Sequence, residues 1–331
     1  MSPHKSRDPR AAMTISQLAP ERALRRLELT VVRRLEGYLH GEHLGLLPGP
    51  GTELAEAREY QVGDDVRRMD WAVTARTTMP HVRDLIADRE LETWALVDLS
   101  ASMDFGTSQL EKRELAVAAV ATVGFLTHRL GDRFGGLMLR DSALRRWPAR
   151  SGRLALYGLL RALLAEQDTG EHQSRSDLAG ALESMARTQR KRGLRVIVSD
   201  FLTPDDGETD QRLEPSWERP MRKLTVQHQV LAVEIVDPRE MELPNVGVVM
   251  IGDPETGAIR EIDTRKRRVR QEYAAAALAQ RERTRAALRR VGAGHLVLRT
   301  DRDWVADTVR FVLTYRRVAQ RLHQPPKGVA R

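Results

Sequence analysis

Short apolar runs alternate with longer stretches of helical spacing over most of the chain. Continuous apolar runs are typical of parallel strands covered on both faces, and they predict strands at 93–99, 133–139, 194–198, 229–236 and 295–298. Apolar residues recur with helical spacing at 111–130, 153–166, 178–190, 265–291 and 303–322. This alternation predicts an α/β fold with a doubly wound, mostly parallel sheet and helices on both faces.

Turn residues predict smaller elements within this pattern. Residues 143–147 follow the second predicted strand closely enough to form a hairpin with it. The sequence Asp253-Pro-Glu-Thr-Gly257 separates apolar segments at 246–251 and 258–262, which predicts a second hairpin. A short helix is predicted at 217–224.

The first 92 residues lack this alternation. An amphipathic helix is predicted at 21–39, and a Gly/Pro-rich loop follows it. We expect the rest of this region to form a small β-rich segment packed against the main domain. The predicted organisation is a disordered N-terminus at 1–20, the helix and β/loop segment at 21–92, the α/β domain at 93–322 and a flexible tail at 323–331.

Composition narrows the class of protein. A chain of 331 residues can bury a sizeable core, and the absence of cysteine excludes disulfides and zinc–thiolate sites. The charged N-terminus lacks the apolar centre of a signal peptide, and the run at 115–126 is too short to cross a bilayer. We therefore expect a soluble, cytoplasmic protein without a transmembrane segment. The net charge of +8 is dispersed among acids, so no specific nucleic-acid binding is expected.

Polar residues follow two of the predicted strands where each strand ends. Asp98, Ser100 and Ser102 form an Asp-x-Ser-x-Ser sequence after the first strand, and Asp200 follows the strand at 194–198. Ser176 lies in a loop before a predicted helix. The carboxyl ends of neighbouring parallel strands meet where strand order reverses, so these oxygens can surround one Mg²⁺ or Mn²⁺. The alternative is a strand that ends in an ordinary N-cap and turn.

This set of residues resembles the metal-ion-dependent adhesion site (MIDAS) of von Willebrand factor A domains. That site has an Asp-x-Ser-x-Ser sequence, a loop Thr and a strand-end Asp, and Ser176 stands here at the Thr position. The resemblance implies a von Willebrand factor A-like fold and a bound Mg²⁺, with Mn²⁺ as an alternative. It also implies that Asp98 and Asp200 neutralise the metal's charge, Asp200 through water, and that Ser100, Ser102 and Ser176 are neutral ligands.

Several flanking sequences resemble the bacterial family called domain of unknown function 58 (DUF58). They are Gly49-Pro-Gly51-Thr-Glu53-Leu54, Arg58 to Trp71, Ala75-Arg76, Ser199 to Leu202, Asp237-Pro238-Arg239-Glu240, Leu243-Pro244 and Asp253 to Gly257. The resemblance extends over roughly residues 22–315. Members of this family often occur beside AAA+ ATPases of the MoxR type, which implies such an ATPase or its client as the partner.

The segment at 52–92 is unusually rich in charge. Its conspicuous residues are Arg58, Tyr60, Asp64, Asp65, Arg67, Asp70, Trp71 and Arg76. They form either a platform that binds a partner or flanks the metal, or a buried network of ion pairs that fixes the segment to the sheet. The buried network is favoured, because charged side chains away from water need partners.

The candidate functions are a metal-dependent interaction module and an enzyme. No histidine is evidently placed to activate Ser100 or Ser102, and no P-loop sequence is present. A hydroxyl-rich site would leave positive charge on the metal, which an acidic residue of a partner can complete. We therefore expect a non-catalytic adaptor or chaperone-like protein that binds its partner through the metal. The alternative is a metal-dependent phosphoester hydrolase.

Overall fold

The computed structural model describes most of the chain in separate stretches. The described residues are 57–60, 69–83, 92–108, 110–128, 132–140, 142–165, 176–202, 214–252 and 259–322. The predictions for 1–20, 21–39, the loop before residue 57 and the tail at 323–331 fall outside these residues.

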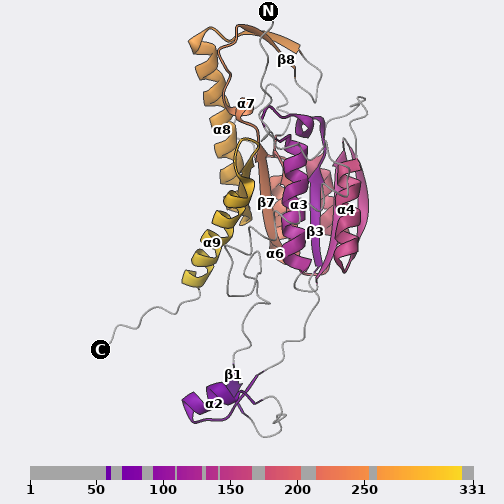
Figure 1. Ribbon diagram of the computed structural model, residues 1–331, viewed down its shortest axis with the longest axis vertical. Helices are drawn as coiled ribbons and strands as arrows, with labels where there is room; N and C mark the ends of the chain where they lie inside the picture. Colours follow the sequence, from indigo (N-terminus) through magenta and orange to yellow (C-terminus); the bar gives the residue numbers. More distant parts are fainter. Residues whose placement is uncertain are drawn as a thin grey trace, which may run out of the picture.

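A six-stranded sheet forms the centre of the α/β domain (Figure 1). Its strands are β3 (Glu92–Asp98), β4 (Arg133–Arg140), β5 (Ala143–Arg150), β6 (Leu194–Ser199), β7 (Gln229–Val236) and β10 (Gly294–Arg299). The strand order is β10-β7-β6-β3-β4-β5. All neighbours are parallel except β4 and β5, which pair antiparallel.

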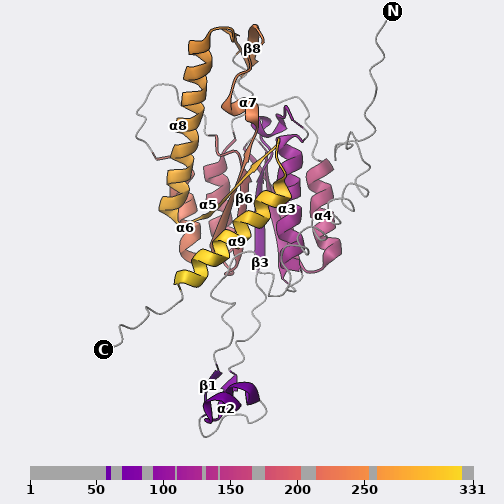
Figure 2. The ribbon, with the colours of Figure 1, turned by 60° about the vertical axis from the view of Figure 1, so that its left-hand side comes forward.

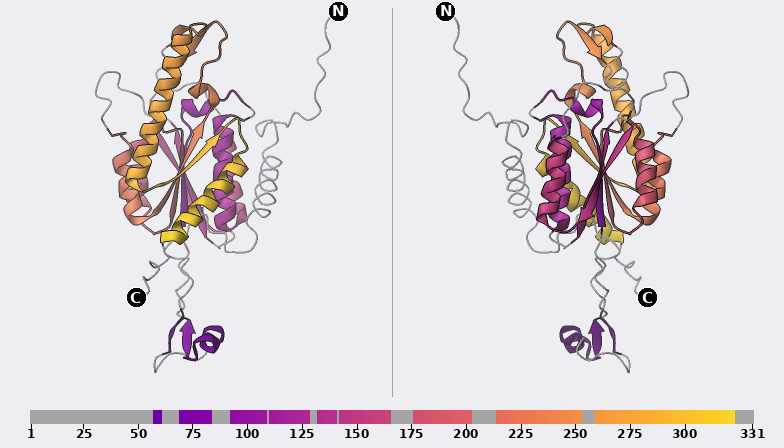
Figure 3. Two further views of the ribbon diagram at one scale, coloured as in Figure 1. Left: turned by 90° about the vertical axis from the view of Figure 1, so that its left-hand side faces the viewer. Right: turned by 90° about the vertical axis from the view of Figure 1, so that its right-hand side faces the viewer.

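Helices cover both faces of this sheet, as the edge-on views show (Figure 3). One face packs against α3 (Lys112–His128), α4 (Arg153–Ala165) and α9 (Trp304–Leu322). The other face packs against α5 (Leu178–Thr188), α6 (Glu218–Gln227) and α8 (Arg267–Val291). Successive strand residues point to opposite faces, so Ala95 and Val97 enter the first core while Trp94 and Leu96 enter the second.

Strand order reverses between β3 and β6. From β3 the chain proceeds outward through β4 and β5, whereas β6, β7 and β10 extend in the opposite direction. The loops that leave the carboxyl ends of β3 and β6 therefore separate, and the edge between them is open to side chains and ligands. The residues after these two strands are Asp98 to Ser102 and Asp200 to Leu202.

The remaining helices and strands lie outside the central sheet and the helices that cover it. The short helix α7 (Pro238–Met241) leads from β7 into a hairpin of β8 (Val248–Gly252) and β9 (Ile259–Asp263). Figure 2 shows this hairpin beside the start of α8. A separate small unit contains β1 (Ala57–Glu59), α2 (Trp71–Thr77) and β2 (His81–Arg83), with β1 and β2 antiparallel.

The predicted fold is confirmed: the protein is α/β with a doubly wound, mostly parallel sheet. Both predicted hairpins are present, and the ends of most elements differ from the prediction by one to three residues. The start of α5 agrees with the prediction, and it is fixed by the N-cap Asp177, whose side chain accepts a hydrogen bond from the amide of Gly180. None of the helices within the described residues is both long and apolar enough to cross a membrane.

Gly193 fixes the approach of β6 to β3. A Cβ atom at this position would collide with the backbone carbonyl of Glu92. We expect Gly193→Ala to lower the free energy of unfolding by about 1–3 kcal/mol, the usual cost of overpacking. Urea denaturation followed by circular dichroism measures this change.

Gly252→Ala is the matched control, because no atom of the described residues, apart from its chain neighbours, lies within 4 Å of its added Cβ. Equal midpoints for the two variants would contradict the proposed role of Gly193.

Candidate functional site

The site begins at the carboxyl end of β3. Asp98 is only 3% exposed, and its Oδ1 accepts a hydrogen bond from the amide of Ser100 at 3.0 Å. This Asx turn directs the chain into the short 3₁₀ helix η3 (Ala101–Asp104). The hydroxyls of Ser100 and Ser102 then lie 3.2 Å apart, and both side chains are buried.

Ser176 reaches the same carboxylate from another loop. It immediately precedes Asp177, the N-cap of α5, so the start of this helix fixes its backbone. The Ser176 hydroxyl lies 3.5 Å from Asp98 Oδ1, at the outer limit of a hydrogen bond. The structure thus brings together Asp98 and the three serines that the sequence predicts.

The end of β6 contributes a hydroxyl that the sequence analysis had not included in the site. Val97 pairs with Val198, so Ser199 lies beside Asp98 in the sheet and donates a hydrogen bond to Asp98 Oδ2 at 2.7 Å. The amide of Phe201 donates to the Ser199 hydroxyl at 3.0 Å. Ser199 therefore holds Asp98 in place and also stabilises the turn that follows β6.

That turn contains an unusual backbone conformation. Phe201 has a φ of 55°, in the left-handed region that non-glycine residues rarely adopt. Its ring packs edge-on against Trp217 with centroids 5.2 Å apart, and both side chains are buried. The Asp200 carboxylate accepts a hydrogen bond from the amide of Leu202 at 3.0 Å. Such conformations persist where packing over-determines them, and they cluster at functional sites.

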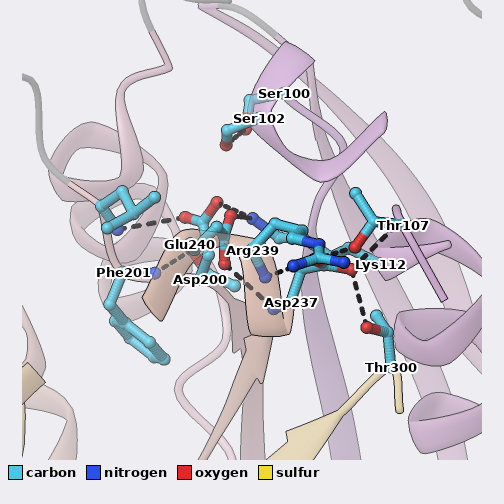
Figure 4. A network of polar contacts seen from close by, with 12 residues as sticks. Ser100, Ser102, Thr107, Lys112, Asp200, Phe201, Asp237, Arg239, Glu240 and Thr300 are labelled. Carbon is cyan, nitrogen blue, oxygen red and sulfur yellow. Dashed lines mark hydrogen bonds and ion pairs between the residues drawn. The ribbon is translucent and has the colours of Figure 1, made fainter. Parts of the chain in front are cut away.

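Asp200 is paired with a buried lysine (Figure 4). The ammonium of Lys112 lies 2.7 Å from Asp200 Oδ2 and also contacts Glu240 Oε1. Burial alone would lower the pKa of Lys112, but the two carboxylates outweigh this effect and raise it. Lys112 therefore remains charged, and Asp200 has a permanent cationic partner.

Asp237 joins three chain segments behind this pair. Its carboxylate accepts hydrogen bonds from the Thr107 amide and hydroxyl at 2.9 and 2.6 Å, and from the Thr300 hydroxyl at 2.7 Å. It also caps α7 by a capping box with Glu240. Burial raises the pKa of Asp237, yet these hydrogen bonds outweigh it and hold the pKa below its usual value.

Asp98 has a different electrostatic environment. Burial raises its pKa, the nearby charge of Asp200 raises it further, and hydrogen bonds from Ser199 and Ser100 only partly compensate, leaving a pKa of about 6. Among the described residues, no cationic side chain forms an ion pair with Asp98. The site therefore contains a buried carboxylate whose charge lacks a positive partner.

The donor set fits a hard divalent cation. Neighbouring ligands of an octahedral Mg²⁺ at about 2.1 Å lie roughly 3 Å apart. The hydroxyls of Ser100 and Ser102 are separated by 3.2 Å, and Ser176 lies 3.5 Å from Asp98 Oδ1. Asp98 and these three hydroxyls are the residues that would hold Mg²⁺ or Mn²⁺. The described residues contain no cluster of three His, Cys, Asp or Glu side chains suited to a metal.

The other predicted residues lie in the small unit that precedes β3. Asp70 is buried and accepts a hydrogen bond from the amide of Val73 at the start of α2. Trp71 is 71% exposed and Arg76 is exposed, while Tyr60 is partly buried. Arg58 lies in β1, opposite Val82. Asp64, Asp65 and Arg67 lie outside the described residues.

Four residues of the site were not predicted from the sequence: Lys112, Ser199, Asp237 and Glu240. Two signals were available: Ser199 precedes Asp200 at the strand end, and Asp237-Pro-Arg-Glu240 has the spacing of a capping box. Nothing local marks Lys112, because its partners Asp200 and Glu240 are 88 and 128 residues away.

Comparison with known proteins places these residues in a family. The family model described as "Protein of unknown function DUF58" matches residues 56–283. This chain belongs to the DUF58 family. The resemblance predicted from the sequence is therefore confirmed, and the family region includes β3, β6, α7 and every predicted metal ligand.

Two relatives of this DUF58 protein come from mycobacteria. The protein named "Uncharacterized protein Rv1480" of Mycobacterium tuberculosis is 52% identical over 302 residues, covering 91% of this chain and 92% of the relative. "Uncharacterized protein MAV169" of Mycobacterium avium is 43% identical over 176 residues, covering 53% of this chain and 97% of the relative.

Solved structures with a related arrangement include BatB from Bacteroides thetaiotaomicron and a von Willebrand factor type A protein from Catenulispora acidiphila. The first has a TM-score of 0.40 and 14% identity, covering 69% of this chain and 99% of its own. The second has a TM-score of 0.35 and 10% identity, covering 72% of this chain and 43% of its own. Such low scores add nothing to what the sheet topology itself shows.

The raised pKa of Asp98 predicts an unusual pH dependence for the metal-free protein. The pKa is about 6 in the folded state against 3.8 for the unperturbed group, so the folded state binds the proton more tightly. Ionisation of Asp98 therefore costs stability as pH rises from about 4 to 6, by at most about 3 kcal/mol. We expect Asp98→Asn to be more stable than the original protein at pH 8, and this advantage to shrink toward pH 4.

Urea denaturation at several pH values in the presence of chelator measures the difference. The asparagine can still accept from the Ser100 amide and donate to the Ser199 hydroxyl. A variant that is less stable by the same amount at every pH would show that Asp98 acts only as a structural hydrogen-bond acceptor.

Proposed function

We propose that this DUF58 protein is a non-catalytic interaction module that binds its partner through a divalent metal. The metal, Mg²⁺ or alternatively Mn²⁺, binds Asp98 together with the hydroxyls of Ser100, Ser102 and Ser176. The partner is an AAA+ ATPase of the MoxR type or its client protein, and it contributes an acidic side chain to the metal. The observation that carries this proposal is the buried, unpaired charge of Asp98 beside three convergent hydroxyls.

The net charge left on the metal supports docking of a partner rather than hydrolysis. Asp98 supplies one negative charge to a divalent cation, and the serine hydroxyls supply none. Asp200 and Glu240 are engaged with the ammonium of Lys112, so their charge is partly neutralised before any metal binds. The metal then retains net positive charge, which attracts a carboxylate from outside. Two-metal hydrolases place several acids directly on their metals, so this charge distribution favours docking over phosphoester hydrolysis.

Apolar side chains at the same edge support a protein partner. Phe105 is 41% exposed and directly follows η3, while Leu202 is 49% exposed and follows Asp200. Each therefore lies on a loop that carries at least one predicted metal ligand. A protein partner that places a carboxylate at the metal can bury these side chains against apolar residues of its own.

Affinity capture tests the proposal. The tagged protein is incubated with lysate of its source organism in the presence of Mg²⁺ or chelator, and bound proteins are identified by mass spectrometry. We expect a MoxR-type ATPase to be retained with Mg²⁺ and lost with chelator. Asp98→Ala should lose it under both conditions, because the metal then lacks its only directly bound carboxylate.

Asp301→Ala is the matched control, because Asp301 is an exposed acid just beyond β10 that pairs with Arg299. It should retain the partner in a Mg²⁺-dependent way. Calorimetric titration with Mg²⁺ should give heat for the original protein and for Asp301→Ala, but not for Asp98→Ala. Identical Mg²⁺ binding by all three proteins would contradict the proposal.

A further inference from the structure

Lys112 occupies a position that ordinary helix energetics disfavour. It is the first residue of α3, where the positive end of the helix dipole repels a cation. Its side chain is nevertheless fully buried. A buried ammonium carries a large desolvation cost, so its position is explained by the carboxylates of Asp200 and Glu240 rather than by the helix.

The ammonium lies where it controls the charge of the metal edge. It contacts Asp200 Oδ2, while Asp200 Oδ1 accepts from the Leu202 amide. Each oxygen of Asp200 therefore already has a donor. Asp98, by contrast, receives only neutral donors from the described residues: the Ser100 amide and the hydroxyls of Ser199 and Ser176.

We propose that Lys112 is a built-in cation that keeps Asp200 out of direct metal coordination and so determines the affinity and the residual charge of the metal site. The inference rests on the proposed function only in placing the metal at Asp98. Lys112 is a positioning residue, because it acts through Asp200 and does not itself bind the metal. Its consequence is a weakly held, electron-poor metal that favours an external carboxylate over one supplied by the protein.

The Lys112–Glu240 contact extends this arrangement to α7. Glu240 Oε2 accepts from the amide of Asp237 at 3.0 Å, while its other oxygen contacts Lys112 (Figure 4). The ammonium is thus held from two sides, by the end of β6 and by the capping box of α7. This geometry leaves it little freedom to move away when a metal binds.

Calorimetric Mg²⁺ titration of a double-mutant cycle tests the proposal. The four proteins are the original, Lys112→Met, Asp200→Asn and the double variant. Removing the ammonium frees the Asp200 carboxylate, so we expect Lys112→Met to bind Mg²⁺ at least about tenfold more tightly. Asp200→Asn should weaken binding by less than about tenfold, far short of the loss in Asp98→Ala. Lys112→Met should bring a much smaller gain when Asp200 is already Asn.

Thermal denaturation with and without Mg²⁺ gives a second readout. Lys112→Met should melt lower than the original protein in chelator and recover more on addition of Mg²⁺. The double variant should melt between Lys112→Met and the original in chelator, because Asp200 is then neutral while the Glu240 carboxylate has still lost its ammonium partner. If Lys112→Met does not fold, the Mg²⁺ affinity of Asp200→Asn tests the inference by itself. A loss of Mg²⁺ binding as complete as in Asp98→Ala would overturn it.

The outcomes separate this inference from the proposed function. Equal Mg²⁺ affinity in the original protein and Lys112→Met would overturn the inference alone, leaving Lys112 a structural residue. Binding by Lys112→Met but not by the original protein would overturn the proposed function and support the inference. Absence of Mg²⁺ binding in all four proteins would overturn both.

Discussion

The structure depends on how it accommodates buried carboxylates at the carboxyl edge of its sheet. Asp98, Asp200 and Asp237 are each at most 5% exposed, and each directly follows or ends a strand. Removing a carboxylate from water costs several kcal/mol unless hydrogen bonds or a cation replace the solvent. The three carboxylates replace their lost solvent in different ways. Asp200 and Asp237 are compensated as structural acids, whereas Asp98, the candidate metal ligand, is not.

Asp237 is stabilised chiefly by hydrogen bonds, and Asp200 by an ammonium. Both arrangements hold parts of the fold together: Asp237 joins the loop after η3 to the ends of β7 and β10, and Lys112 joins α3 to β6 and α7. Within the described part of the chain, Asp98 has only neutral donors, and its pKa rises to about 6. Its charge is therefore a net cost to the metal-free fold, whereas the pKa of Asp237 is lowered.

Much of this was predictable from local sequence. The apolar runs predicted the strands, and the polar residues at their ends predicted Asp98, Ser100, Ser102 and Asp200. Ser176 was predicted from its loop before a helix. The local pattern was sufficient because β3 and β6 are neighbours and their register places Asp98 beside Ser199. Lys112 and Thr107 were not predictable, because their partners lie 88 to 130 residues away and depend on the strand order. The high exposure of Trp71 was likewise not predictable from the charge pattern of its segment.

The uncompensated charge of Asp98 is a stability cost that a single substitution could remove. Replacing a buried, uncompensated carboxylate by a neutral isostere usually raises the free energy of unfolding. Natural proteins often keep such a destabilising group where function requires it. The other two acids at this edge are compensated: Asp200 is paired with a cation, and Asp237 accepts several hydrogen bonds. At this edge two acids are compensated, while the third has neutral donors and lies beside a cluster of hydroxyls, which is the charge distribution that the proposed cation site requires. The strained Phe201 conformation, held by Trp217 on the neighbouring loop, is a second cost at the same edge. Both costs fall at the switch point of the sheet, where the fold leaves room for a ligand.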